Sequence, residues 1–174
     1  DEPALAGILL GAIVSDTMNF RSPTTTKLDV VTKNRLEEIC GVSAEELSKG
    51  LIDHSESLLS KRHIEIVYND FKEFNIEGNK VGLSQAICKS KEEYDALKTD
   101  LARYMEDACK SGGYDLMAIM LTNPNGSGSY VLSAGARKRV VKDAFRINSD
   151  GFVNGLVSRK KQLLPGMIKA LGAK

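Results

Sequence analysis

The 174-residue sequence contains only three cysteines and two histidines. Cys40, Cys88 and Cys109 are odd in number and widely spaced, and they form no CxxC pair. Neither a disulfide framework nor a zinc knuckle is therefore predicted, and we expect ordinary buried thiols in a reducing, cytoplasmic environment. His54 and His63 have neither HxxxH nor HxH spacing, which argues against a self-contained metal site.

Long apolar runs and charged leader segments are also missing. The longest apolar run, residues 4–14, has eleven residues, whereas a helix needs about 20 to cross a bilayer. Asp1 and Glu2 occupy the place where a signal peptide carries positive charge. We therefore expect no membrane partner.

Several motifs of catalysis and phosphate binding do not occur. GxSxG, GxxxxGK[ST] and GxGxxG are all absent, so the sequence offers no nucleophile elbow or phosphate-binding loop. The segment "NPNGSG", residues 123–128, predicts a turn. No aromatic residues alternate with the cations of the C-terminal tail, and we therefore expect no nucleic-acid partner.

With 42% hydrophobic and 27% charged residues, the chain can form a sizeable core. Two sequence patterns, Thr26 with Asp29 and Ser43 with Glu46, resemble capping boxes. Helices are predicted over about residues 3–16, 27–40, 43–52, 91–111 and 136–145 and after residue 158. Period-two alternation predicts a hairpin over residues 63–88, with its turn at Glu77–Asn79, and further strands at 114–122, 129–135 and 151–158. This pattern indicates an α/β fold, with a mixed, partly antiparallel sheet covered by helices on both faces.

The first predicted helix is apolar on every side, which is typical of a helix packed between other elements. Because such a helix is unusual at a terminus, we expect the chain to be the C-terminal piece of a longer protein.

Asp16 is the one acid near the end of this helix. Burial and the negative helix end both disfavour a carboxylate there. Asp16 is therefore either a hydrogen-bonded structural residue, which local reasoning favours, or a metal ligand.

Positive charge gathers in the last part of the chain. Residues 136–174 contain ten Lys and Arg against two Asp and Glu, a balance of +8, while residues 1–135 have a balance of −7. Ser158 stands between a predicted strand and helix and is placed to cap that helix. Arg159, Lys160 and Lys161 follow it directly, and cations at a helix N-terminus oppose the macrodipole. A bound phosphate or pyrophosphate would offset that cost; the alternative is a solvated first turn.

Three segments together resemble a known family. "LAGILLGAIVSDTMNFRSPTTT", "KEFNIEGNKVGLSQ" and "VSRKKQLLP" are similar in order and separation to the C-terminal portion of manganese-dependent, family II inorganic pyrophosphatases of the DHH phosphoesterase superfamily. The resemblance covers almost the whole chain. It implies residues 1–18 as the end of the N-terminal catalytic DHH domain, 19–26 as a linker and 27–174 as the DHH-associated substrate-binding domain.

The resemblance also implies site residues and a cofactor. Asp16 resembles the last metal-ligating aspartate, and Lys72, Arg159 and Lys160 resemble the ligands of the substrate phosphates. Lys161 is a weaker match, and local reasoning alone makes Lys72 a solvated residue of an edge strand. In the complete enzyme, two Mn²⁺ ions, or Co²⁺ or Mg²⁺, would activate a bridging water that attacks pyrophosphate, while the cations stabilise the developing charge.

The family's Asp-x-Asp and Asp-His-His motifs do not occur in this chain. We therefore assign it no catalytic residue of its own, expect no tightly held metal and predict that it does not hydrolyse pyrophosphate alone. The partners implied are pyrophosphate, the missing N-terminal domain and, for the full-length protein, a second copy in a homodimer. The alternatives are an exopolyphosphatase or another DHH phosphoesterase, or a non-catalytic anion-binding or interaction domain.

Overall fold

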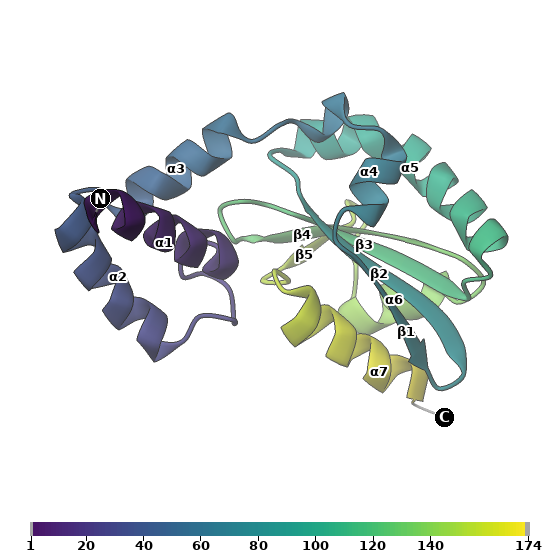
Figure 1. Cartoon of the computed structure of the whole chain (residues 1–174). Helices are drawn as coiled ribbons and strands as arrows, with labels where there is room; N and C mark the ends of the chain where they lie inside the picture. Colours follow the sequence, from purple (N-terminus) through teal and green to yellow (C-terminus); the bar gives the residue numbers. More distant parts are fainter. Residues whose placement is uncertain (1, 173–174) are drawn as a thin grey trace. The chain divides into compact units, whose positions relative to one another are not determined.

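The structure is a computed structural model that describes residues 2–172 (Figure 1). The chain forms two compact units. The first comprises the residues up to Glu56 together with Pro124–Gly126, and the second comprises Ser57–Asn123 and Ser127 onward. Each unit has its own buried side chains and is described separately.

The first unit contains three helices whose ends are set by local hydrogen bonds. Both predicted capping boxes are present: the Thr26 and Ser43 side chains accept from the backbone N–H of Asp29 and Glu46, whose carboxylates bind back. Gly41 ends the second helix in the left-handed region, with φ of 71°, where glycine is favoured. The helices are α1 (Glu2–Thr17), α2 (Lys27–Cys40) and α3 (Ala44–His54).

Helix α1 buries one side and exposes another. Leu10 and Val14 pack with residues of α2 and α3, whereas Leu5 and Ile8 are 58% and 70% exposed. Among the helices of residues 2–172, none is long and apolar enough to span a membrane.

The compact units divide at a different place from the predicted linker. Because α1 packs with α2 and α3, residues 19–26 lie inside the first unit, and the chain passes into the second unit after Glu56. The assignment of residues 1–18 and 27–174 to two functional domains of a longer protein stays a prediction.

The second unit is built on a five-stranded sheet in the order β1-β2-β3-β4-β5. Strands β2 and β3 are parallel, and the other neighbours are antiparallel. The sheet is therefore mixed, as predicted. In chain order the elements are η1 (Leu58–Ser60), α4 (His63–Tyr68), β1 (Phe71–Ile76), β2 (Asn79–Ile87), α5 (Lys91–Gly112), β3 (Leu116–Thr122), β4 (Gly128–Ala134), α6 (Lys138–Phe145), β5 (Phe152–Asn154), η2 (Arg159–Leu163) and α7 (Leu164–Gly172).

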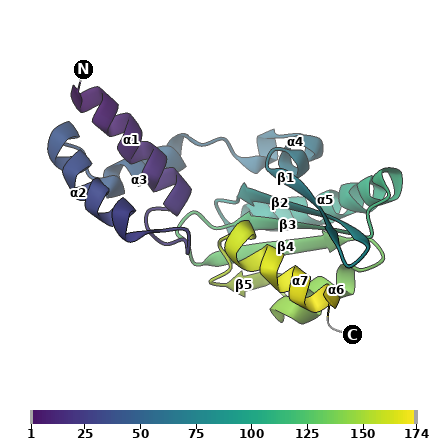
Figure 2. The same ribbon diagram turned by 60° about the horizontal axis from the view of Figure 1, so that its bottom comes forward.

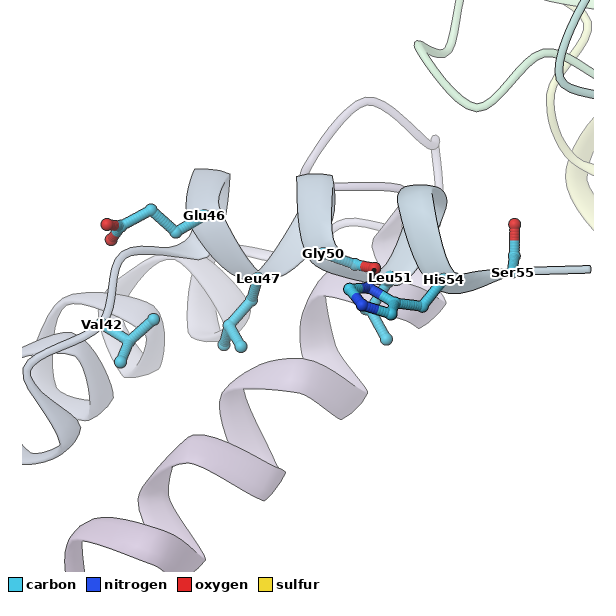
Figure 3. Close-up of a pocket in the computed structure, with 7 residues that line it drawn as sticks. All are labelled: Val42, Glu46, Leu47, Gly50, Leu51, His54 and Ser55. Carbon is cyan, nitrogen blue, oxygen red and sulfur yellow. Dashed lines mark hydrogen bonds between the residues drawn. The ribbon is translucent and has the colours of Figure 1, made fainter.

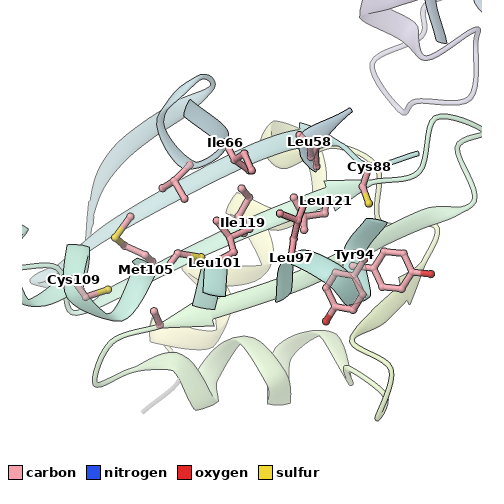
Figure 4. Close-up of a cluster of buried hydrophobic side chains, with 14 residues drawn as sticks. Leu58, Ile66, Cys88, Tyr94, Leu97, Leu101, Met105, Cys109, Ile119 and Leu121 are labelled. Atoms are coloured by element: carbon pink, nitrogen blue, oxygen red, sulfur yellow. The ribbon is translucent and has the colours of Figure 1, made fainter. Parts of the chain in front are cut away.

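Helices cover both faces of this sheet (Figure 2). On one face, α4 and α5 enclose a buried cluster that includes Leu101 and Ile119 (Figure 4). On the other face, Leu163 and Met167 of η2 and α7 pack with Leu83 of β2. Strand β3 is buried along its whole length, as expected for a strand covered on both sides. The predicted α/β fold class is confirmed.

The predicted first strand begins too early. Residues His63–Tyr68 form helix α4, whereas the sequence pattern placed them at the start of the hairpin. The Glu65 carboxylate accepts from the Arg62 N–H at 2.8 Å and stabilises the first turn. Ile66 and Val67 are both buried, and adjacent buried positions do not fit a strand that is covered on one face only.

The remaining hairpin is confirmed. β1 and β2 pair antiparallel from Phe71↔Ser84 to Ile76↔Asn79. Glu77 and Gly78 both have positive φ, 51° and 78°, as the tight hairpin turn requires.

The cysteines are reduced and mostly buried. Cys88 and Cys109 are buried, and burial raises the pKa of their thiols to about 12 and about 11. Such thiols carry almost no thiolate at neutral pH and are therefore unreactive. Cys40 is only half-buried, so the prediction of three buried thiols is correct for two of them.

Candidate anion site

The chain reaches the candidate site at the start of η2. The buried Ser158 side chain accepts a hydrogen bond from the Lys161 N–H at 3.2 Å, which confirms the predicted cap. η2 is π-helical: the N–H groups of Leu163 and Leu164 donate to carbonyls five residues earlier. π-Helical turns occur often at functional sites.

Gln85, near the end of β2, holds the backbone of this turn in place. Its Oε1 accepts from the Arg159 N–H at 3.2 Å, and its Nε2 donates to Val157 O and Thr122 Oγ1, both at 3.0 Å. The start of η2 is therefore tied to two central strands. In the described part of the chain, the Lys160 N–H has no acceptor, so it is available to an anion.

The Arg159 side chain reaches from η2 to the residue that precedes β1. Its Nη1 donates to the Asp70 carbonyl oxygen, and its Nη2 lies 3.0 Å from Asp70 Oδ1. The Arg159 side chain is only 14% exposed, whereas that of Asp70 is 46% exposed. The guanidinium is therefore fixed by two contacts to one residue, while its other N–H groups are not committed to Asp70.

Lys72 lies two residues after Asp70, on the edge strand β1. It pairs in register with Leu83, and Leu83 packs in the cluster under η2 and α7. Phe74 and Ile76, at alternate positions of β1, contact the same cluster. Since side chains alternate between the faces of a strand, Lys72 lies on the sheet face that η2 covers.

Lys160 and Lys161 are exposed, as is Lys72. Within residues 2–172, none of these three lysines forms an ion pair with a carboxylate. Two uncompensated lysines and the partly neutralised Arg159 thus lie on the first turn of η2, and Lys72 lies on the sheet face that this turn covers. Such a group attracts anions with several negative charges.

Asp16 lies in the other compact unit, at the end of α1. Its side chain is exposed, whereas local reasoning expected a buried, hydrogen-bonded structural residue. Its carbonyl oxygen accepts from Thr24 Oγ1 at 3.1 Å. The exposed carboxylate has no hydrogen-bond donor among the described residues, which leaves it available to a cation.

The turn after Asp16 has unusual backbone geometry. Met18, Asn19 and Phe20 have φ of 51°, 52° and 64°, and the left-handed region costs about 1–2 kcal/mol for each residue other than glycine. Buried Thr17 supports this turn, because its Oγ1 accepts from the Phe20 N–H at 3.1 Å. Strain of this kind is found preferentially near functional sites.

The described residues do not make a metal site by themselves. No group of three or more His, Cys, Asp or Glu side chains in residues 2–172 is placed to hold a metal ion. Asp16 alone supplies one carboxylate, whereas a catalytic metal ion takes several protein ligands. A metal centre would therefore need residues from elsewhere.

A surface hollow in the first unit lies along α3 (Figure 3). Its lining is mainly apolar and includes Val42, Leu47 and Leu51. The ring of His54 at its edge is hydrogen-bonded through Nδ1 to Gly50 O at 2.8 Å. No lysine or arginine among the described residues lines this hollow, so it does not resemble the basic turn of η2.

Sequence reasoning did not find Asp70 or Gln85. Asp70 carries a weak signal, since its position two residues before Lys72 predicts the same face of the strand. Gln85 carries no sequence signal of its role, because its hydrogen-bond partners at residues 122, 157 and 159 are distant in sequence.

Comparison with known proteins identifies the family. The DHHA2 domain family matches residues 49–170. The chain belongs to the DHHA2 domain family. The match covers the sheet, its helices and the η2 turn, so the structural features around Arg159 belong to this DHHA2 domain. The resemblance inferred from the three sequence segments is thereby confirmed.

Relatives of this DHHA2 chain are named as pyrophosphatases. A manganese-dependent inorganic pyrophosphatase of Methanocaldococcus jannaschii is 37% identical over 173 residues, which are 97% of this chain and 56% of the relative. A cobalt-dependent inorganic pyrophosphatase of Clostridium perfringens is 37% identical over 169 residues, 95% of this chain and 31% of the relative. The chain thus spans about half the length, or less, of these relatives.

A solved structure agrees with the computed one over nearly the whole DHHA2 chain. The crystal structure of a candidate family II inorganic pyrophosphatase from Methanococcus jannaschii has a TM-score of 0.84 and 36% sequence identity. The match covers 99% of this chain and 57% of that chain. Fold and family therefore agree.

Proposed function

We propose that this DHHA2 domain is the substrate-binding part of an inorganic pyrophosphatase that splits pyrophosphate into two phosphates. Lys72, Arg159 and Lys160 are the proposed ligands of the substrate phosphates. The observation that carries the proposal is the Arg159–Asp70 contact. It joins the basic turn of η2 to β1 beside Lys72, so cations far apart in sequence face one substrate. The pyrophosphatase relatives support the choice of ligand.

The proposed work of these residues is charge neutralisation and orientation. The free N–H groups of the Arg159 guanidinium form a planar fork that can contact two phosphate oxygens. Lys72 and Lys160 supply mobile point charges on exposed side chains. Cations already in position stabilise the charge that develops on the transferred and leaving phosphates, because little reorganisation is needed in the transition state.

A catalytic metal ion needs a cluster of ligands that residues 2–172 do not supply. The relatives named above depend on manganese or cobalt, and such an ion supplies an activated water when bound. Asp16 is the one metal ligand that we propose from this chain. We propose that the other ligands belong to an N-terminal DHH domain of the full-length protein, which acts as a cytoplasmic homodimer.

We predict that the purified 174-residue chain does not hydrolyse pyrophosphate, even with added Mn²⁺. The described residues provide cations for the substrate but no cluster that could hold the metal. The measurement is phosphate release with 1 or more equivalents of chain per substrate molecule. Turnover above that of a buffer control containing Mn²⁺ would show that the chain carries its own catalytic groups.

We also predict that the chain binds pyrophosphate weakly and that salt weakens this binding further. The proposed ligands are exposed or partly exposed cations, and the Debye length falls from about 10 Å at 0.1 M ionic strength to about 3 Å at 1 M. Calorimetric titration at several NaCl concentrations measures the effect.

Substitution of single lysines tests which cations contribute to this salt dependence. Lys72→Gln and Lys160→Gln should each reduce the slope of log Kd against log salt. Lys110→Gln is the matched control, because Lys110 lies on α5, which covers the opposite sheet face. Binding that does not respond to ionic strength would argue against a site made of Arg and Lys.

A further inference from the structure

The carboxylate of Asp70 lies next to a group of cations that we propose to bind an anion. A negative charge there should weaken anion binding by direct repulsion. It nevertheless faces Arg159, and both its backbone carbonyl and its side chain are used. The carbonyl contact would exist with any residue at position 70, so the contribution that is specific to aspartate is the ion pair with Nη2.

The contact determines where the guanidinium points. Arginine loses much side-chain entropy when it is ordered. Arg159 is ordered by Asp70 on its side-chain end and by Gln85 on its backbone N–H. One of its five N–H donors is hydrogen-bonded to the Asp70 carbonyl oxygen, and its Nη2 is in ion-pair contact with the Asp70 carboxylate, so further N–H donors remain for a ligand. The guanidinium is thus already oriented before any phosphate arrives.

The contact also sets the relation between two distant segments. Asp70 and Arg159 are 89 residues apart in sequence, and Lys72 follows Asp70 on the same sheet edge. A contact at Asp70 therefore places the arginine of η2 beside the lysine of β1. Without it, η2 would still be attached through Gln85, but the arginine side chain would be free to rotate.

We propose that Asp70 is a positioning residue that orients the Arg159 guanidinium for the substrate phosphates. This inference rests on the proposed function, in which Arg159 binds pyrophosphate. Asp70 does not touch the substrate and acts only through Arg159. Its favourable effect on orientation exceeds its electrostatic repulsion of the anion.

The test is a double-mutant cycle on the 174-residue chain, with inorganic pyrophosphate as the probe and calorimetry as the measurement. We expect Asp70→Ala to weaken binding about fivefold to tenfold when Arg159 is present, since one charge-assisted contact is lost. On the Arg159→Ala background the same substitution should have no weakening effect. Asp70→Asn keeps an oxygen acceptor and the backbone carbonyl, and it should restore binding to within about twofold of wild type.

A matched control separates orientation from a general change in charge. Glu73 also lies on β1, but its carboxylate faces the other side and accepts from the Tyr114 hydroxyl at 2.8 Å. Glu73→Gln removes one negative charge from the same strand. It should leave pyrophosphate binding unchanged or slightly tighter. Circular dichroism of every variant establishes that the sheet is intact.

The possible outcomes are distinct. Tighter binding by Asp70→Ala would mean that the carboxylate merely competes with phosphate for Arg159, and the positioning role would be wrong. Equal weakening by Asp70→Ala with and without Arg159 would also overturn it, because Asp70 would then act on the fold and not through the arginine. If Arg159→Ala alone binds pyrophosphate as wild type does, the proposed function itself fails, whatever Asp70 does.

Discussion

Replacing Arg159 with lysine in the full-length protein should lower kcat/KM for pyrophosphate by about a hundredfold. The substitution keeps the positive charge but removes the planar fork. A lysine ammonium carries its three donors on one compact centre, so it cannot reach Asp70 and also present two parallel N–H groups to phosphate oxygens. The loss should appear mainly in kcat, since contacts that strengthen as charge develops act on the transition state.

The measurement is steady-state phosphate release with the metal-loaded full-length protein. Arg139→Lys is the control, because Arg139 is exposed on α6, outside the group of cations at η2. The control should behave as wild type does. If Arg159→Lys leaves both kcat and KM unchanged, Arg159 is not a substrate ligand.

Glu93 should be the acid on which the second unit depends most for stability. Its buried carboxylate accepts from Ser57 Oγ, Leu58 N and Lys89 N, each at 2.6 Å. Glu93→Ala removes all three hydrogen bonds and leaves the buried Leu58 N–H without its acceptor, which alone costs about 1–3 kcal/mol. We therefore expect the free energy of unfolding to fall by about 3–5 kcal/mol.

Tyrosine fluorescence can follow this unfolding specifically. The chain has no tryptophan, and its five tyrosines all lie in the second unit. Asp100→Asn is the control: Asp100 is an exposed acid on the same helix, and among the described residues its ion-pair partner is the likewise exposed Arg103. The control should change stability by less than about 0.5 kcal/mol. A loss of similar size in Glu93→Ala would show that the buried carboxylate contributes little.

The effect of Glu93 should also depend on pH. Burial by itself raises the pKa of this carboxyl, but hydrogen bonds from the Ser57 hydroxyl and the backbone N–H groups lower it by more, so the folded-state pKa lies below its ordinary value. The stabilisation is therefore fully present above the ordinary pKa of glutamate and is lost as pH falls through the lowered value. The stability difference between wild type and Glu93→Gln should shrink in acid; a difference independent of pH would contradict this explanation.

Much of the local structure could be predicted from the sequence because its causes are local. Capping boxes at Thr26 and Ser43 and the cap at Ser158 each depend on residues three apart. The antiparallel hairpin and the buried strand β3 follow from the spacing of apolar residues. Helix α4 was missed because the apolar spacing of a six-residue segment fits both a helix and a strand. Only the packing of the segment against the sheet distinguishes the two structures.

The candidate site was predicted in part. Arg159 and Lys160 were candidates from the charge that follows Ser158 as well as from the family resemblance, whereas Lys72 was named from the resemblance alone. Their role as phosphate ligands stays a proposal. The sequence could not identify Asp70 as the partner of Arg159. The two residues are 89 positions apart, and no local sequence pattern predicts their contact. Gln85 was missed for the same reason, since its contacts depend on strands that become neighbours only in the folded chain.

The sequence by itself determined the capped helices, the hairpin, the α/β class and a basic turn behind a serine cap, since each depends on neighbouring residues. Only the tertiary structure decided the order β1-β2-β3-β4-β5 and the division into units after Glu56. It also decided that the basic turn meets β1 at Asp70. These features depend on contacts between segments that are distant in sequence. Such contacts stabilise the chain only once the whole sheet has formed.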